Sequence, residues 1–219
     1  MDSVIDMEEA RRLVSDAALW PRVRDFLWDF GPQIHPSRLP AGLTTLVGQS
    51  PRVKRFVLDA LGVTPVFHDF PQSDNSRLLL LPSDMLVGLA KWLGALSCAA
   101  ALRRIMDGAK VRALKSALPD VYPAVFSYTA YFRDLEGQEP SRFDGLSGDD
   151  IVKGVVNTGY DIVFSFLSSL PDGLVNRLLL KLPDDVVLPQ PSNGQTVKPS
   201  NLQKILKLKF PEAYALCCS

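Results

Sequence analysis

Few side chains in this sequence of 219 residues are suited to acid–base or metal chemistry. Histidine exchanges protons near neutral pH, and the chain has only two, His35 and His68. Neither has a Cys or a carboxylate at the spacing of a metal site, although Asp69 directly follows His68. A His–Asp neighbour pair is common by chance in a loop. We therefore predict no metal site, and keep an atypical hydrolytic site at His68 and Asp69 only as an alternative.

The three cysteines do not form a disulfide framework. Cys98 lies among apolar residues and is typical of a small core side chain. Cys217 and Cys218 are adjacent, so they lack the C-x-x-C spacing of a redox or metal pair. We interpret them as part of a frayed terminus, with reversible lipidation as an unsupported alternative, and expect reduced thiols.

The sequence contains none of the phosphate-binding or nucleophile motifs G-x-x-x-x-G-K-[ST], G-x-G-x-x-G and G-x-S-x-G. Two carboxylate pairs, Asp149-Asp150 and Asp184-Asp185, each lie beside a predicted helix end, and helix-start electrostatics explain the first pair. We therefore predict that the protein is not an enzyme, has no catalytic residue and binds no cofactor.

Basic side chains are concentrated in one predicted helical segment. They are Arg103, Arg104, Lys110, Arg112 and Lys115, predicted to lie opposite Leu102, Ile105 and Met106. Such a stripe could bind an acidic partner, in which case salt would weaken the complex. The stripe is more typical of an ordinary solvated helix face, because exposed Arg and Lys are common on helices, but the acidic partner stays an alternative.

A stiff loop surrounds the first histidine, because Pro36 and Pro40 forbid a regular helix there. His35 and Arg38 in this loop could contact a ligand or a partner. Alternatively, Ile34 and Leu39 anchor the loop to the core while Arg38 binds a carbonyl at a helix end.

The overall composition excludes several classes of protein. Lys+Arg and Asp+Glu are both 24, so the chain lacks the basic excess of a general nucleic-acid binder. Hydrophobic residues make up 47%, which is enough for a sizeable core. The N-terminus has no apolar signal region, and the longest uncharged apolar runs are shorter than the ~20 residues of a membrane helix. We expect a cytoplasmic protein without direct membrane insertion.

The periodicity predicts a mainly α fold: a compact, bundle-like set of helices joined by Pro-marked loops, with few or no strands. A wide apolar stripe from Met85 to Leu96 predicts a central helix that is buried on most sides. Further helices are expected after Ser50-Pro51, with Gly62 as the stop, and after Ser147.

Details of the helices give further expectations. Phe56 is predicted to share an apolar helix face with Val53, Val57 and Leu61. Arg177 and Lys181 are predicted to lie opposite the apolar face of their helix. We expect Trp28 to be half exposed beside its apolar stripe. Gly159 would be explained by a close approach between two helices, and Ser200 is expected to cap the last long helix.

The predicted domain organisation has three parts. Residues 1–183 form a main helical domain, residues 184–199 a Pro-rich connector, and residues 200–219 a C-terminal helix that packs on or near the main domain.

Four segments together resemble the SctK (YscK-like) proteins of type III secretion systems. They are I-H-P-S-R-L-P at residues 34–40, L-L-L-L-P at 78–82, L-R-R-I-M-D-G-A-K-V-R-A-L-K-S-A-L at 102–118 and L-P-D-G-L-V-N-R-L-L-L-K-L-P at 170–183. Their order and spacing extend the resemblance over residues 26–183. His35, Ser37 and Arg38 match the best-defined motif, while the connector and the Cys-Cys end lie outside the match.

The resemblance implies a non-enzymatic adaptor of the sorting platform, at the cytosolic face of the inner membrane. Such a protein bridges the cytosolic domain of the SctD-like inner-membrane ring protein to the SctQ-like pod protein. The alternative is a chaperone-like or regulatory helical protein that binds an acidic partner through Arg103, Arg104, Arg112 and Lys115.

Overall fold

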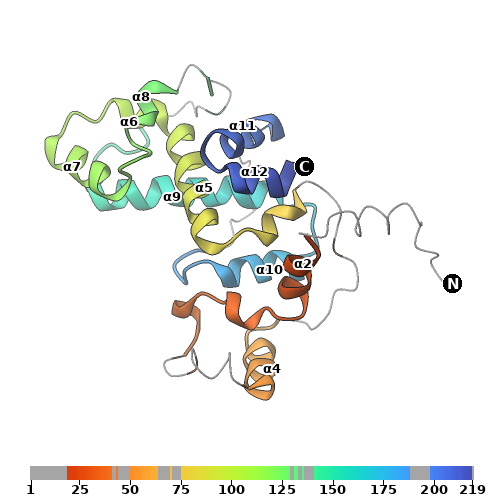
Figure 1. Ribbon diagram of the computed structural model, residues 1–219. Coiled ribbons are helices and arrows are strands. Elements are labelled where there is room, and N and C mark those ends of the chain that lie inside the picture. Colours follow the sequence, from red (N-terminus) through yellow and green to blue (C-terminus); the bar gives the residue numbers. More distant parts are fainter. Residues whose placement is uncertain are drawn as a thin grey trace. The chain divides into compact units, whose positions relative to one another are not determined.

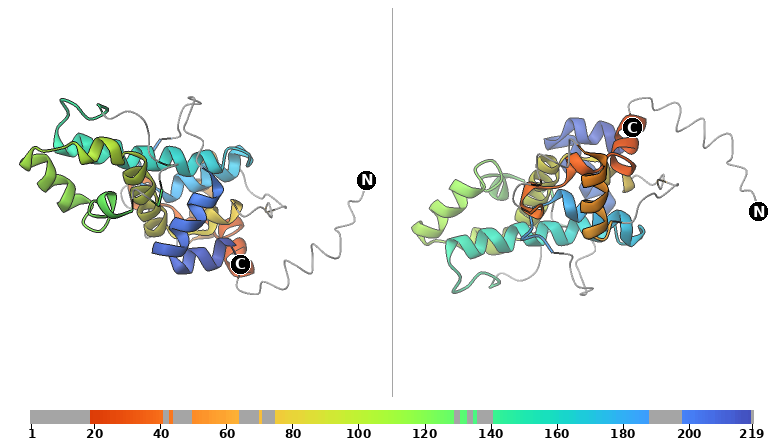
Figure 2. Two further views of the ribbon diagram at one scale, coloured as in Figure 1. Left: turned by 90° about the horizontal axis from the view of Figure 1, so that it is seen from above. Right: turned by 90° about the horizontal axis from the view of Figure 1, so that it is seen from below.

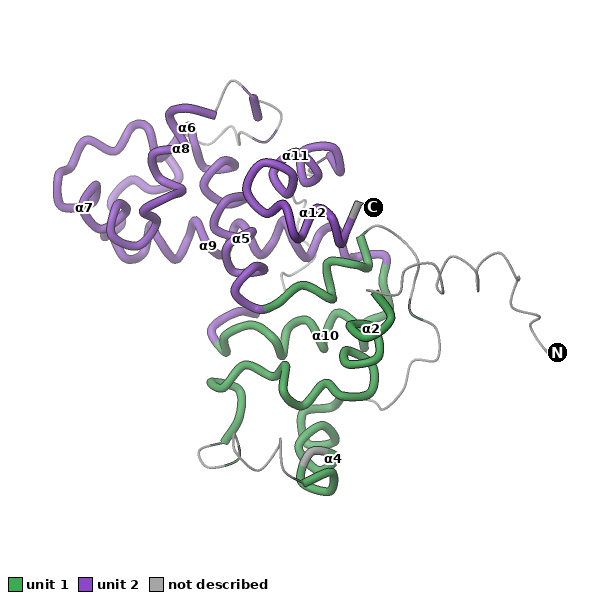
Figure 3. Tube along the Cα trace, viewed as in Figure 1, with its two compact units in different colours: residues 1–82, 170–184 green, residues 83–169, 185–219 purple. Residues whose placement is uncertain are grey.

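The computed structural model forms two compact units, and each is discontinuous in sequence (Figures 1 and 3). Unit 1 comprises residues 1–82 and 170–184, and unit 2 comprises residues 83–169 and 185–219. The structure describes residues 19–40, 43, 50–63, 70, 75–128, 131–132, 135, 141–187 and 198–218. His68 and Asp69 lie outside the described residues, as does most of the predicted connector, so the predicted three-part division stays a prediction.

Unit 1 is built from three α-helices and three short 3-10 helices within the described residues. In chain order they are α2 (Leu19–Leu27), η1 (Gly31–Gln33), η2 (Pro36–Arg38), α4 (Pro51–Ala60), η3 (Ser76–Leu80) and α10 (Asp172–Lys181). Helices α2 and α10 both pack on η3, whose leucines are buried. Each buried leucine contributes about 1.5–3 kcal/mol by leaving water, so this short run is central to the unit.

Local sequence signals begin and end α4 as predicted. The Ser50 side chain accepts a hydrogen bond from the backbone N–H of Val53, and Pro51 occupies the first turn. Gly62 follows the helix with φ of +69°, a left-handed conformation that favours glycine. The predicted apolar face of α4 is only partly covered, because the Phe56 side chain is 68% exposed while Val57 is buried.

Unit 2 contains the longest helices. Its elements are α5 (Ser83–Ser97), α6 (Ala99–Arg103), α7 (Gly108–Ala117), α8 (Ala124–Ser127), α9 (Gly148–Phe166), α11 (Pro199–Lys209) and α12 (Pro211–Cys218). Residues 92–99 are all buried, which confirms the central helix predicted from the apolar stripe. The N-terminal part of α9 lies beside α7 in both views of Figure 2.

Helices α5 and α9 cross with their backbones in contact. A Cβ atom on Gly94 of α5 would overlap the carbonyl oxygen of Val155, and one on Gly159 of α9 would overlap the carbonyl oxygen of Ala90. Glycine is therefore required at both positions, because any side chain would force the helices apart. The close approach predicted at Gly159 is confirmed.

The C-terminal helices α11 and α12 pack on each other, and α11 packs on α5. The Lys209 ammonium lies 4.6 Å from the ring centroid of Trp92 and 5.0 Å from that of Tyr128. Phe210 covers Gly88, where an added Cβ would lie 3.1 Å from the Phe210 ring. These contacts anchor the helix pair on α5.

Two predictions about the C-terminal segment are wrong. The last residues are not a frayed tail, because α12 is helical and Cys217 is 2% exposed. Helix α11 begins at Pro199 with Lys198 at the cap position, so Ser200 lies inside the first turn.

The fold class predicted from the sequence is confirmed. Every regular element within the described residues is a helix. None of the helices in this described part is both long enough and apolar enough to cross a lipid bilayer.

Candidate functional site

The loop of residues 34–40 is fastened to the end of α10 inside unit 1. The Arg38 side chain donates hydrogen bonds from Nε to the carbonyl oxygen of Leu182 at 2.7 Å and from Nη2 to that of Pro183 at 2.6 Å. These carbonyls follow the last turn of α10, where no helical N–H is available to them. Ile34 is buried in the same loop. The structure thus shows the anchoring role that the sequence left as an alternative for Arg38.

Further bonds make this loop a clasp, by which we mean residues 35–38 and their partners on residues 180–184. The backbone N–H of His35 donates to the carbonyl oxygen of Leu180 at 2.8 Å. Ser37 Oγ accepts a hydrogen bond from the backbone N–H of Asp184 at 3.0 Å and lies 2.8 Å from His35 Nδ1. The partner-binding role predicted for His35 and Arg38 stays a prediction, with these groups already bonded within the unit.

Arg177 of α10 is buried, which corrects the prediction that it lies on an outer face. Its side chain is 2% exposed, and Nη1 donates to the carbonyl oxygens of Phe26 and Leu27 at 2.7 and 2.8 Å. The guanidinium also lies 5.9 Å from the Phe26 ring centroid and 5.7 Å from that of Phe30. A cation at these carbonyls completes the C-terminus of α2 and is favoured by the helix dipole. Burial lowers the pKa of Arg177.

Lys181, one turn further along α10, is also buried rather than exposed. Its Nζ atom donates to the carbonyl oxygen of Leu79 at 2.9 Å and lies 5.6 Å from the Phe26 ring centroid. Burial, with a smaller contribution from the charge of Arg22, lowers the pKa of Lys181 to about 7. Both basic side chains of α10 therefore hold unit 1 together from the inside.

The basic segment of unit 2 does not form the single face predicted from the sequence. Helix α6 ends at Arg103, and α7 begins only at Gly108, after Asp107 caps it by accepting from the N–H groups of Ala109 and Lys110. At 3.6 residues per turn, Arg112 and Lys115 share one side of α7, whereas Lys110 lies roughly half a turn away from Arg112. The five cations are therefore divided between different surfaces.

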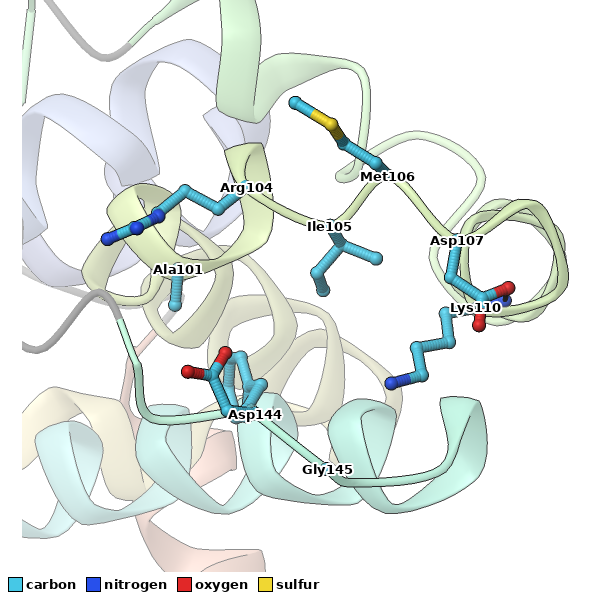
Figure 4. Close-up of a pocket in the computed structure, with 9 residues that line it drawn as sticks. Ala101, Arg104, Ile105, Met106, Asp107, Lys110, Asp144 and Gly145 are labelled. Carbon is cyan, nitrogen blue, oxygen red and sulfur yellow. Dashed lines mark hydrogen bonds between the residues drawn. The ribbon is translucent and has the colours of Figure 1, made fainter.

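Arg104 and Lys110 come together at a pocket of about 300 Å³. The pocket is enclosed by the segment that joins α6 to α7 and by the loop before α9 (Figure 4). Its buried or partly buried lining consists of the apolar residues Ala101, Ile105 and Phe143 together with Lys110. In Figure 4, Ile105 lies between Arg104 and Lys110. This surface was only partly predictable, because nothing in the sequence indicated that residues 143–145 would join it.

The rim of the pocket carries both signs of charge. Asp107 and Asp144 lie on it together with Arg104 and Lys110. The carboxylate of Asp107 is occupied by the first N–H groups of α7, and these bonds lower the pKa of Asp107. Within the described residues, Arg104 and Lys110 take part in no ion pair. Met106 at the rim is 93% exposed, although the sequence predicted an apolar face for it.

An exposed tryptophan pair forms another surface feature, in unit 1. Trp20 and Trp28 both lie on or directly after α2, with ring centroids 5.9 Å apart in an edge-to-face arrangement. Trp28 is 44% exposed, which confirms the half exposure predicted for it. Tryptophan is enriched at the energetic centres of protein interfaces, so this pair is a candidate contact surface.

The cysteines and carboxylates do not gather into a site within the described part of the chain. No group of three or more His, Cys, Asp or Glu side chains there could hold a metal ion. Burial raises the pKa of the Cys98 thiol, which makes it a poor nucleophile at neutral pH.

These features define a helical protein whose distinctive surfaces are suited to binding other macromolecules. A family model described as "YOP proteins translocation protein K (YscK)" matches residues 26–219, which is most of the chain. The chain therefore belongs to the YscK family of type III secretion proteins. The family resemblance predicted from residues 26–183 is confirmed, and it extends through the C-terminal helices.

Neither the search of curated proteins nor the search of solved structures returned a match to this chain.

Proposed function

We propose that this protein is a non-enzymatic adaptor of the type III secretion sorting platform. It joins the cytosolic domain of the SctD-like inner-membrane ring protein to the SctQ-like pod protein, at the cytoplasmic face of the inner membrane. The observation that carries the proposal is the family match over residues 26–219. The identities of the two partners are taken from the family resemblance, and the exposed surfaces described above are compatible with binding them.

The division of the chain into two compact units also supports an adaptor role. Unit 1 presents the Trp20–Trp28 pair, and unit 2 presents the pocket with Arg104 and Lys110. An adaptor needs two separate binding surfaces so that both partners can be held at once. We propose that each unit supplies one of them.

Reconstitution with purified proteins tests the proposal. Full-length chain, ring-protein cytosolic domain and pod protein are mixed in pairs and together, and the complexes are resolved by size-exclusion chromatography with light scattering. We expect a ternary complex that forms only when this chain is present. Absence of binding to both partners would contradict the adaptor role.

A clean deletion in the source bacterium gives the matching test in cells. Secretion through the type III system should be lost while growth is unchanged, and a plasmid copy should restore secretion. Normal secretion in the deletion strain would exclude the proposed function.

A further inference from the structure

We propose that the pocket of unit 2 binds an acidic segment of a partner protein by taking up one apolar side chain of that segment. The proposal specifies the kind of partner segment and the residues that hold it, and it rests on the proposed function only in assuming that the chain binds other proteins. We call this surface the anchor pocket, defined by Ala101, Arg104, Ile105, Met106, Lys110, Phe143 and Asp144.

The size and lining of the anchor pocket are sufficient for one apolar side chain. Its volume of about 300 Å³ is at the lower end of the ~300–1,000 Å³ range of small-molecule sites. Ala101 and Phe143 are buried and provide an apolar floor together with Ile105. An apolar side chain inserted there would leave water on most sides, which is the usual source of binding energy at an interface anchor.

The charges indicate an acidic segment. Arg104 is exposed and Lys110 partly exposed, and neither forms an ion pair within the described residues. The rim also carries two carboxylates, but the charge of Asp107 is partly offset by the positive N-terminal end of the α7 dipole, so Arg104, Lys110 and this helix end together outweigh Asp107 and Asp144. Carboxylates of a partner would therefore be attracted to Arg104 and Lys110, and the complex would weaken as salt is added.

Two other rim residues refine the partner. Met106 is 93% exposed, and its flexible thioether can adapt to the apolar side chain that enters. Asp144 repels a carboxylate placed next to it, so the acidic residues of the ligand must lie beside Arg104 or Lys110 and away from Asp144. The ligand is thus an acidic segment with one apolar anchor and with no acidic group above Asp144.

The test uses the full-length protein and a short fluorescein-labelled peptide in which a central Leu is flanked by Glu residues, with binding followed by fluorescence anisotropy. We expect Arg104→Glu and Lys110→Glu to weaken binding about tenfold or more, which equals about 1.4 kcal/mol, and Asp144→Asn to tighten it. Matched peptides with Gln in place of Glu, or Ser in place of Leu, should each bind more weakly.

Lys115→Glu is the matched control, because it makes the same charge change on α7 at a residue that does not line the pocket. We expect it to weaken binding less than about threefold, through long-range attraction alone. A loss as large as those of Arg104→Glu and Lys110→Glu would show general electrostatic attraction instead of an anchor pocket. If the peptide with Ser in place of Leu binds as tightly as the original, the apolar anchor is contradicted. If the original peptide does not bind, the proposal is overturned.

A peptide of residues 1–18, which are acidic overall, is added as a competitor. Strong competition would assign the pocket to this chain's own N-terminal segment and overturn the partner assignment; its absence supports that assignment. If the peptide does not bind but the ternary complex forms, only this inference is contradicted. If the peptide binds but no ternary complex forms, only the proposed function is contradicted.

Discussion

The Nζ atom of Lys181 donates a 2.9 Å hydrogen bond to the carbonyl oxygen of Leu79, so the head of a buried lysine rests on the backbone of η3. Burial lowers the pKa of this lysine from 10.5 to about 7. The unfolded chain keeps the ordinary pKa and therefore binds more protons than the folded chain between about pH 7 and pH 10.5. The contribution of Lys181 to the free energy of unfolding is therefore fully present above about pH 10.5. It decreases as the pH falls across this window and is lost once the pH has fallen through about 7.

Replacing Lys181 with Met removes this pH dependence. We expect the free energy of unfolding of the wild type, minus that of Lys181→Met, to increase by roughly 2–4 kcal/mol between pH 7 and pH 10. Urea denaturation at several pH values measures it. Arg55→Met, an exposed change on α4 in the same unit, controls for the lost charge. A difference that is constant with pH would contradict the buried, proton-poor state of Lys181.

The clasp gives a second prediction, because Arg38 binds two carbonyl oxygens beyond the end of α10. Arg38→Ala should lower the free energy of unfolding by about 2–3 kcal/mol, since hydrogen bonds from a charged donor contribute about 1.5–3 kcal/mol each and water replaces part of them. Arg52→Ala, an exposed change on α4, should cost less than about 0.5 kcal/mol.

The same variant separates the two interpretations of the loop. If Arg38 acts only as an anchor, Arg38→Ala should bind the ring domain and the pod protein normally at a temperature at which it is fully folded. Loss of one partner by the folded variant would show that the loop also contacts that partner.

The crossing of α5 and α9 gives a third prediction. Gly159→Ala places a methyl group into the carbonyl of Ala90 and should destabilise unit 2 by about 3 kcal/mol or more. Gly154→Ala on the same helix meets a side chain instead of backbone, the Phe143 ring at 3.1 Å, and gains up to about 1 kcal/mol of helix propensity against the cost of shifting that ring, so it should cost much less than Gly159→Ala. Differential scanning calorimetry compares the two variants, and equal melting temperatures would argue against the backbone contact.

Lys209 gives a fourth prediction through its position over Trp92 and Tyr128. Lys209→Ala should cost about 1–2 kcal/mol because both cation–π contacts are lost. Lys204→Ala, an exposed change on the same helix, should have little effect on stability. Chemical denaturation followed by tryptophan fluorescence measures both variants. Similar small losses in the two would mean that the aromatic pair does not hold α11.

Local signals carried most of the successful predictions about the fold. Ser50 and Ser147 begin their helices because a cap depends on a hydrogen bond that spans only a few residues. The burial of residues 92–99 followed from the width of the apolar stripe, and Gly159 was explained by the only kind of contact that requires a glycine in a helix interior.

The failed predictions depend on partners that are distant in sequence. Periodicity placed Arg177 and Lys181 opposite the leucines of α10, but it could not show that carbonyls of α2 and η3 would surround that side. The anchor pocket was partly missed for the same reason, since residues 143–145 reach it through the packing of α9 on α7. Phe56 shows the converse, because an apolar face does not guarantee a neighbour to cover it.

The contact between Arg177 and the end of α2 also has a consequence for how the chain is made. Arg177 follows Phe26 by 151 positions, so at about 5–20 residues per second it leaves the ribosome roughly 8–30 s later. Throughout that time, the first part of unit 1 lacks the helix that caps α2. Unit 1 can therefore be completed only after α5 to α9 of unit 2 have been made, and unit 2 itself is completed last, when α11 and α12 follow.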